Sequence, residues 1–265
     1  GPQTLTFTNT DGDLSGTATL ADGIMPNKFY GLTGAIAVTL EAAAPVHETV
    51  NFGTPNLNWS KYNLGVDPSN LSTAADWYGW YLMWGSTTSG GDPNCDWKYC
   101  PGNGGYGFFN ESEITKWDAL NLPNGVLNAD VDAATANWGE GWRMPTQDEW
   151  QKLHDNNTFE WLYAGSTSTN VTSFTAVAAG CLVVKGKADS RDLDPTVYMF
   201  LPAALYRYGT NIQYNDDVNY YWSSSLSTES KMYVYCLGFN SEVVTSKTTP
   251  SRDYGCLVRP VLVAR

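Results

Sequence analysis

The sequence predicts an α+β protein, in which two short helices pack on mostly antiparallel strands and a small β unit precedes them. Both helix signals fall between residues 128 and 153, near the middle of the chain. From about Phe174 onwards, runs of β-forming residues alternate with Gly, Asn, Ser and Pro. This order, helices first and then a series of strands, is typical of helices that cover one side of an antiparallel sheet.

The first 45 residues differ in composition from the rest and contain no Trp. Because about 45 residues are marginal for an independent core, three interpretations stay open: a separate β module, part of one, or strands added to the main domain, 46–265. Asn, Asp and Gly separate the short β-forming runs of this segment, which lie at 5–8, 16–20 and 34–41.

The main domain begins with a region rich in aromatic rings. Trp77, Trp80 and Trp84 are spaced as on one face of a helix. Gly79 and Gly85 weaken a helix at this place. We therefore expect these rings to pack in the core, with a sugar-binding platform as the alternative.

A helix start is the clearest local signal in the chain. Thr146 and Glu149 have the spacing of a capping box, in which each side chain accepts a hydrogen bond from a backbone N–H that the helix start leaves open. Trp150 and Leu153 then fall on one face of this helix. We expect that face to lie against the core.

A second, shorter helix is predicted at 128–137. Asn128 or Asp130 would cap its N-terminus, and Gly139 would end it. β-forming residues dominate afterwards. We place strands at 174–185, 198–205, 220–224, 232–239, 242–245 and 255–263.

Composition limits the classes of function. The 265-residue chain carries a formal net charge of −12, whereas nucleic acids and anionic membrane surfaces require clustered Lys and Arg. No run approaches the roughly 18 apolar residues of a membrane-spanning helix. No charged, apolar leader opens the chain, so we expect any export signal to have been removed. With 11 Trp and 16 Tyr, the chain has the rings that ligand-binding surfaces use, although a Trp-rich core would explain them too.

Three motifs carry a resemblance to a known group of proteins. The motifs are RMPTQDEW at 143–150, YYWSSS at 220–225 and CLVRPV at 256–261. In this order they resemble Bacteroidetes-type surface proteins with a C-type lectin-like domain, and segments 50–65, 77–85 and 200–209 fit the same pattern. More distantly, the chain resembles the formylglycine-generating-enzyme branch of that superfold through the R-x-PT-x-x-EW element alone, and its retroelement-diversified branch through the composition of 206–253.

The resemblance covers residues 46–265 and implies a C-type lectin-like fold. It also implies a protein outside the cell or on its surface, anchored at the outer membrane as a lipoprotein or as part of a pilus tip. The expected function is non-enzymatic adhesion or ligand binding, with a glycan or a protein as ligand and other subunits of a surface assembly as further partners. A purely structural surface or pilus subunit is an alternative.

The stretch 206–253 holds the candidate ligand site. It is crowded with Asn, Tyr, Ser, Thr and Asp, the mixture with which antibody loops combine large amphipathic contacts and adaptable hydrogen bonds. An ordinary polar loop has a similar composition, and both interpretations stay open. The predicted ligand-binding residues are Arg207, Tyr208, Asn211, Gln213, Tyr214, Asn215, Asp217, Asn219 and Tyr220.

Two details refine this expectation. In the retroelement-diversified proteins that the chain resembles, Asn- and Tyr-rich positions near the C-terminus are varied to change the ligand. Calcium-dependent sugar binding is not expected, because the EPN, QPD and WND triplets of such lectins are absent. For Asp216 and Asp217, two interpretations stay open: ligands of a cation, or part of a solvated turn.

An oxidase is the other alternative. The formylglycine-generating branch uses two cysteines near its C-terminus, and Cys236 and Cys256 are the candidates here. Their apolar neighbours indicate buried strand positions instead, so neither a catalytic residue nor a cofactor is predicted. Cys95 and Cys100 are expected to form a disulfide in an exported protein, with free thiols or a metal site as alternatives.

Overall fold

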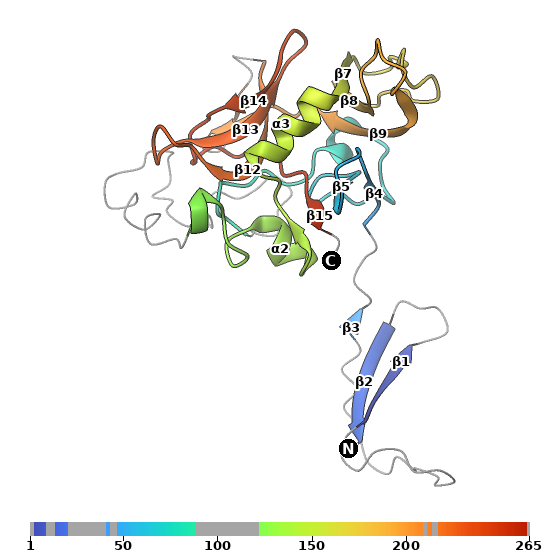
Figure 1. The fold of residues 1–265 in the computed structure, drawn as a ribbon, viewed down its shortest axis with the longest axis vertical. Helices are drawn as coiled ribbons and strands as arrows, with labels where there is room; N and C mark the ends of the chain where they lie inside the picture. Colours follow the sequence, from blue (N-terminus) through green and yellow to red (C-terminus); the bar gives the residue numbers. More distant parts are fainter. Residues whose placement is uncertain are drawn as a thin grey trace. The chain divides into compact units, whose positions relative to one another are not determined.

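The computed structural model describes residues 3–8, 14–20, 41–42, 47–87, 122–208, 211–213 and 217–263. The chain divides into two compact units, Gly1–Val46 and His47–Arg265. In the first unit, three strands form an antiparallel sheet in the order β1-β2-β3 (Figure 1). These strands are β1 (Gln3–Thr8), β2 (Leu14–Leu20) and β3 (Glu41–Ala42). β1 and β2 coincide with two of the predicted β-forming runs, and all of the third except Glu41 lies outside the described residues.

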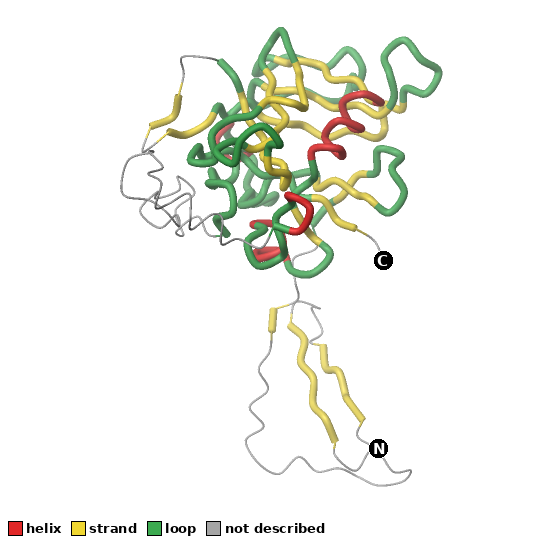
Figure 2. The backbone as a smooth tube through the Cα atoms, turned by 60° about the vertical axis from the view of Figure 1, so that its left-hand side comes forward, coloured by secondary structure: helices red, strands yellow, loops and turns green. Residues whose placement is uncertain are grey.

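In the second unit, short strands alternate with loops, and helix is scarce among the described residues (Figure 2). The strands are β4 (Thr49–Val50), β5 (Leu57–Ser60), β6 (Trp142–Arg143), β7 (Asn157–Leu162), β8 (Gly180–Lys185), β9 (Asp194–Pro202), β10 (Tyr206–Tyr208), β11 (Asn211–Gln213), β12 (Asn219–Leu226), β13 (Val234–Phe239), β14 (Val244–Thr248) and β15 (Val261–Val263). The helices are η1 (Ala74–Trp77), η3 (Pro123–Gly125), α2 (Ala133–Trp138) and α3 (Gln147–Asn156).

The described strands of the second unit pair into four small antiparallel sheets. Their orders are β4-β5-β15-β6, β7-β8-β9, β10-β11 and β12-β13-β14. α3 packs on the β12-β13-β14 sheet and also contacts β7 (Figure 1). The segment 255–258 runs between the sheets and connects them, because isolated bridges join Gly255 to Arg207, Cys256 to Leu82 and Leu257 to Tyr221.

The three sequence motifs meet in the interior, and we call residues 143–150, 220–225 and 256–261 the motif core. The predicted capping box is confirmed: Glu149 Oε2 accepts from Thr146 N (2.8 Å), and Thr146 Oγ1 accepts from Glu149 N (3.3 Å). The same carboxylate forms a bidentate ion pair with the Arg143 guanidinium, the strongest common geometry for such a pair. The start of α3 is thereby fixed to β6.

The second motif completes the start of α3. Ser224 N donates to Pro145 O (2.7 Å), and Ser225 Oγ accepts the N–H of the first α3 residue (3.1 Å). The indole of Trp150 donates to Trp222 O (3.2 Å). Both Trp rings are fully buried, as expected for Trp150 from its place on the helix.

The third motif places a charged group in the interior. Arg259 is 1% exposed, and among the described residues it takes part in no ion pair. Its Nη1 donates to Ser60 O (3.1 Å) at the end of β5, and its Nη2 donates to Phe200 O (2.6 Å) in β9. Burial lowers the pKa of this guanidinium to about 10. Arg259 therefore joins two sheets through their carbonyl groups.

The predicted α+β class, with a C-type lectin-like arrangement of two helices on a layer of strands, is wrong. Strands account for 38% and helices for 12% of the described residues. The Asp132 cap and the Gly139 stop confine α2 to six residues, and β7 begins directly after the ten residues of α3. Because these helices are so short, they do not form a layer, and residues of several small sheets share one hydrophobic core.

Among the described residues, no helix combines the length and the apolar character that crossing a bilayer requires.

Candidate functional site

Four of the predicted ligand-binding residues lie on one short hairpin. β10 carries Arg207 and Tyr208, β11 carries Asn211 and Gln213, and Tyr208 lies opposite Asn211. Two backbone hydrogen bonds between Arg207 and Gly255, of 2.8 and 2.9 Å, fasten the hairpin to the interior. The fold therefore brings these four positions together on a supported backbone.

The other predicted positions have different surroundings. Tyr214 and Asn215 lie outside the described residues, and Asp217 is exposed. Asn219 is buried, and its amide bonds to backbone at both ends: Oδ1 accepts from Leu205 N (2.6 Å), and Nδ2 donates to Phe239 O (3.1 Å). Leu205 has a φ of +60°, which is unfavourable for a branched residue. Asn219 thus holds the turn before β10 in place.

Tyrosine rings support the base of the hairpin. Tyr206 stacks on Tyr254, with 4.7 Å between ring centres and 14° between planes, and Tyr220 lies 5.1 Å from Tyr206. The Tyr208 ring meets Tyr254 edge-on at 5.6 Å. Burial, followed by the neighbouring thiols, raises the pKa of Tyr220. The predicted residue Tyr220 is therefore a neutral, half-buried ring of this cluster.

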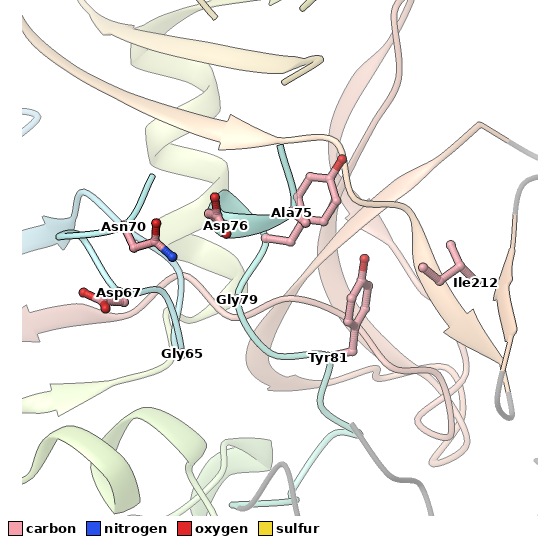
Figure 3. A pocket seen from close by; sticks show the side chains of 9 residues that line it. Gly65, Asp67, Asn70, Ala75, Asp76, Gly79, Tyr81 and Ile212 are labelled. Carbon is pink, nitrogen blue, oxygen red and sulfur yellow. The ribbon is translucent and has the colours of Figure 1, made fainter. Parts of the chain in front are cut away.

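A pocket of about 410 Å³ lies beside the hairpin. The segment 65–81 supplies most of its wall, and Ile212 of β11 supplies the rest (Figure 3). Segments separated by more than a hundred residues in the sequence thus share one cavity. We call the lining the pocket region; it consists of Gly65, Asp67, Asn70, Ala75, Asp76, Tyr78, Gly79, Tyr81 and Ile212.

Two glycines shape the backbone of the pocket. Gly65 has a φ of +86° and lies against the Trp80 ring, which a Cβ would meet at 2.3 Å. Gly79 has a φ of +76°, and a Cβ there would meet Leu64 O at 2.4 Å. Only glycine combines these conformations with such close approach. Asn63 also holds the two segments that carry these glycines together, because its Nδ2 donates to Tyr78 O (2.8 Å).

The pocket region contains two carboxylates, and turns hold both of them. Asp67 Oδ1 accepts from Ser69 Oγ (2.7 Å) and Ser69 N (2.9 Å), and these bonds lower the pKa of Asp67. Asp76 Oδ2 accepts from Thr73 N (2.6 Å) and Thr73 Oγ1 (2.9 Å), with the same effect on its pKa. Both side chains are therefore ionised at neutral pH.

Tyr81 connects the pocket to the hairpin. Its hydroxyl donates to Ala204 O (2.7 Å), just before β10, and the Arg207 guanidinium lies over its ring at 5.1 Å. Tyr81 thereby contributes both to the pocket wall and to the position of β10. Of the tryptophans beside it in sequence, Trp84 is fully buried, whereas Trp77 and Trp80 are partly buried.

Sequence reasoning did not single out Asp67, Asn70 or Asp76. Their only local signals are turn residues in 67–76, which are typical of any exposed turn. The packing of 65–81 against the hairpin gives these side chains a common cavity, and no local pattern encodes that contact.

Cys236 and Cys256 are fully buried, and burial raises the pKa of both thiols. β12 lies between β13, which carries Cys236, and the segment with Cys256. Two strand spacings of about 4.8 Å place the two Cα atoms roughly 9–10 Å apart, beyond the approximately 7 Å that a disulfide can bridge. The open pair of thiols that the oxidase alternative requires is not formed by this geometry. Cys95 and Cys100 lie outside the described residues.

Within the described ranges, no three His, Cys, Asp or Glu side chains gather into a group that could hold a metal ion.

Comparisons of the chain with protein-family models, with curated proteins and with solved structures found no match.

Proposed function

We propose that this chain is a non-enzymatic ligand-binding module of a bacterial surface protein, and that its ligand enters the pocket between the 65–81 segment and the β10-β11 hairpin. One observation carries the proposal. Composition singled out the stretch that contains the hairpin as a binding element, and Ile212 of that hairpin lines a cavity of about 410 Å³.

The dimensions and lining of the pocket support binding. Its volume of about 410 Å³ falls in the range of small-ligand sites, roughly 300–1,000 Å³. Tyr78, Tyr81 and Ile212 offer apolar area, and Asp67, Asn70 and Asp76 offer a few polar groups. Such a combination binds and orients a ligand without a nucleophile or a metal.

Rigid support of the pocket favours recognition too. Its glycine turns, the Tyr81 hydroxyl and the Gly255 contacts hold the walls before a ligand arrives. A site formed in advance loses less conformational entropy on binding than one that must be ordered.

A blocking substitution tests the proposal. Ala75 is exposed and lines the pocket, so Ala75→Trp should fill the cavity without disturbing the core. Ala136→Trp places the same ring on an exposed position of α2, outside the pocket. Both variants and the wild type are applied to a glycan array and to immobilised host and bacterial surface proteins.

We expect the wild type and Ala136→Trp to bind the same ligands, and Ala75→Trp to lose at least tenfold in affinity for them. Equal binding by Ala75→Trp, in a protein with unchanged circular dichroism, would contradict the proposed site.

A further inference from the structure

The two sides of the pocket differ in chemistry. Asp67, Asn70 and Asp76 lie on one side, and Tyr81 and Ile212 lie on the other (Figure 3). A ligand that fills the cavity therefore meets charged and amide oxygens at one end and apolar surface at the other. This division selects an elongated, amphipathic group.

The charged side of the pocket is negative. Asp67 and Asp76 are ionised, and within the described residues neither of them forms an ion pair. The bonds from Ser69 use Oδ1 of Asp67 and those from Thr73 use Oδ2 of Asp76, so the other oxygen of each carboxylate takes no part in these bonds. Two negative charges on the wall of one cavity attract a cation and disfavour an anion.

The apolar side suits an aliphatic stem rather than a second charge. Tyr78, Tyr81 and Ile212 bury methylene groups well, and aromatic rings also attract cations through their faces. The Arg207 guanidinium already lies over the Tyr81 ring. A ligand cation is therefore expected at the carboxylates, with its stem along the rings.

We propose that the pocket binds a lysine side chain of a protein partner, with the ammonium group between Asp67 and Asp76 and the methylene stem along Tyr78, Tyr81 and Ile212. The inference rests on the proposed function and names its ligand class. A lysine stem is apolar and ends in a compact charge with three donors, which matches the two sides of the cavity.

Other ligand classes match the charged and apolar sides of the pocket less well. A neutral sugar would gain hydrogen bonds from the carboxylates but no attraction between opposite charges. An anionic ligand would add a third negative charge, in a chain whose formal net charge is already −12. The observations therefore favour a cation.

The test is a nuclear magnetic resonance titration of the full chain with four probes. These are Nα-acetyl-lysine methylamide, its Nε-acetylated form, methyl glucoside and glucosamine. The decisive variant is Asp67→Asn with Asp76→Asn, because an Asn oxygen keeps the turn bonds and only the charge is lost. Asp194→Asn is the matched control, since Asp194 forms the same kind of turn, with Thr196, outside the pocket.

We expect the lysine probe to shift resonances of the pocket region, and the Nε-acetylated form to bind at least tenfold more weakly. The double variant should lose at least tenfold in affinity for the lysine probe, and Asp194→Asn should not. Sodium chloride should weaken the wild-type binding as it screens the charges.

Three outcomes would overturn the inference: equal binding of the two lysine probes, unchanged binding by the double variant, or binding of glucosamine or the glucoside without the lysine probe. If a sugar binds and Ala75→Trp blocks it, the ligand class is wrong and the proposed pocket stands. If Ala75→Trp also leaves binding on the arrays unchanged, both proposals are wrong.

Discussion

In the motif core, polar side chains bond to distant parts of the chain, whereas in the pocket region they bond mostly within a single turn. Arg259 reaches Ser60 across 199 residues of sequence, and Ser224 reaches Pro145 across 79. By contrast, Asp67 bonds to Ser69 and Asp76 to Thr73.

This difference separates two uses of polar residues. A side chain whose hydrogen bonds are all made inside the protein stabilises the fold and has little left for a ligand. A carboxylate that only caps its own turn keeps an oxygen for one. The motifs that carry the resemblance to surface proteins therefore describe how the interior is held together, and the ligand recognition proposed above would use residues outside them.

The largest expected effect is in the motif core. Trp222→Ala removes a fully buried ring and its indole bond to Leu82 O (2.7 Å), and should cost about 3–5 kcal/mol of unfolding free energy. Tyr163→Ala, at a ring that is 64% exposed, should change it by less than about 0.5 kcal/mol. Urea denaturation measures both. A loss below about 1 kcal/mol for Trp222→Ala would remove the contrast between core and surface.

Asp132→Ala should have the next largest effect. Its carboxylate caps α2 by accepting from Ala134 N and Thr135 N, and it also accepts from Met144 N in the motif core. Losing the cap costs about 1 kcal/mol, and a buried unpaired N–H adds about 1–3 kcal/mol. We expect a total of about 2–4 kcal/mol in urea denaturation. The exposed Asp130→Ala serves as the control, and equal losses in the two variants would show that the buried contacts contribute nothing.

Much of the helical structure could be predicted, because its signals are local. The capping box at Thr146 and Glu149 is confirmed, and Gly139 ends α2 as expected. The cap of α2 is Asp132 rather than Asn128 or Asp130. The bond to Met144, twelve residues away, favours Asp132, and local propensity does not encode that contact.

The third expected effect depends on pH and lies outside both regions. Glu160 on β7 accepts hydrogen bonds from Ser168, Thr169 and Asn170. Burial acts to raise its pKa, but these bonds outweigh it and lower the pKa from 4.5 to about 2. Because the folded pKa is the lower one, the stabilisation is complete above about pH 4.5 and is lost as pH falls towards 2.

Glu160→Gln tests this window. The difference in urea midpoint between wild type and variant should be constant from pH 7 to about pH 5 and should shrink below pH 4.5. A difference that does not change with pH would show that the carboxylate charge does not hold the 163–179 loop.

The smallest expected effect is on the hairpin. Gln213→Ala should change the unfolding free energy by less than about 0.5 kcal/mol, because this half-buried side chain is assigned to ligand contact rather than to packing. Thermal denaturation measures the change. A loss of unfolding free energy above about 1 kcal/mol would show that Gln213 is a structural residue. Asn219 is already identified as one by its hydrogen bonds to the backbone.

The site was harder to predict than the helices. Composition singled out the stretch that contains the β10-β11 hairpin, yet it grouped Asn219, whose amide bonds to backbone groups, with Gln213. The pocket requires 65–81 to meet Ile212, and that contact follows from the packing of Tyr81 below Ala204 and Arg207. Neither periodicity nor turn chemistry reports contacts over such distances in sequence.

The position of Arg259 has a consequence for how the molecule folds. A guanidinium can leave water without a carboxylate only if enough carbonyl groups surround it, and here they come from both β5 and β9. With one of these strands detached, the cation would be dehydrated and only half solvated by protein, which is strongly unfavourable. The β5 and β9 sheets should therefore form and melt together, as a single cooperative transition.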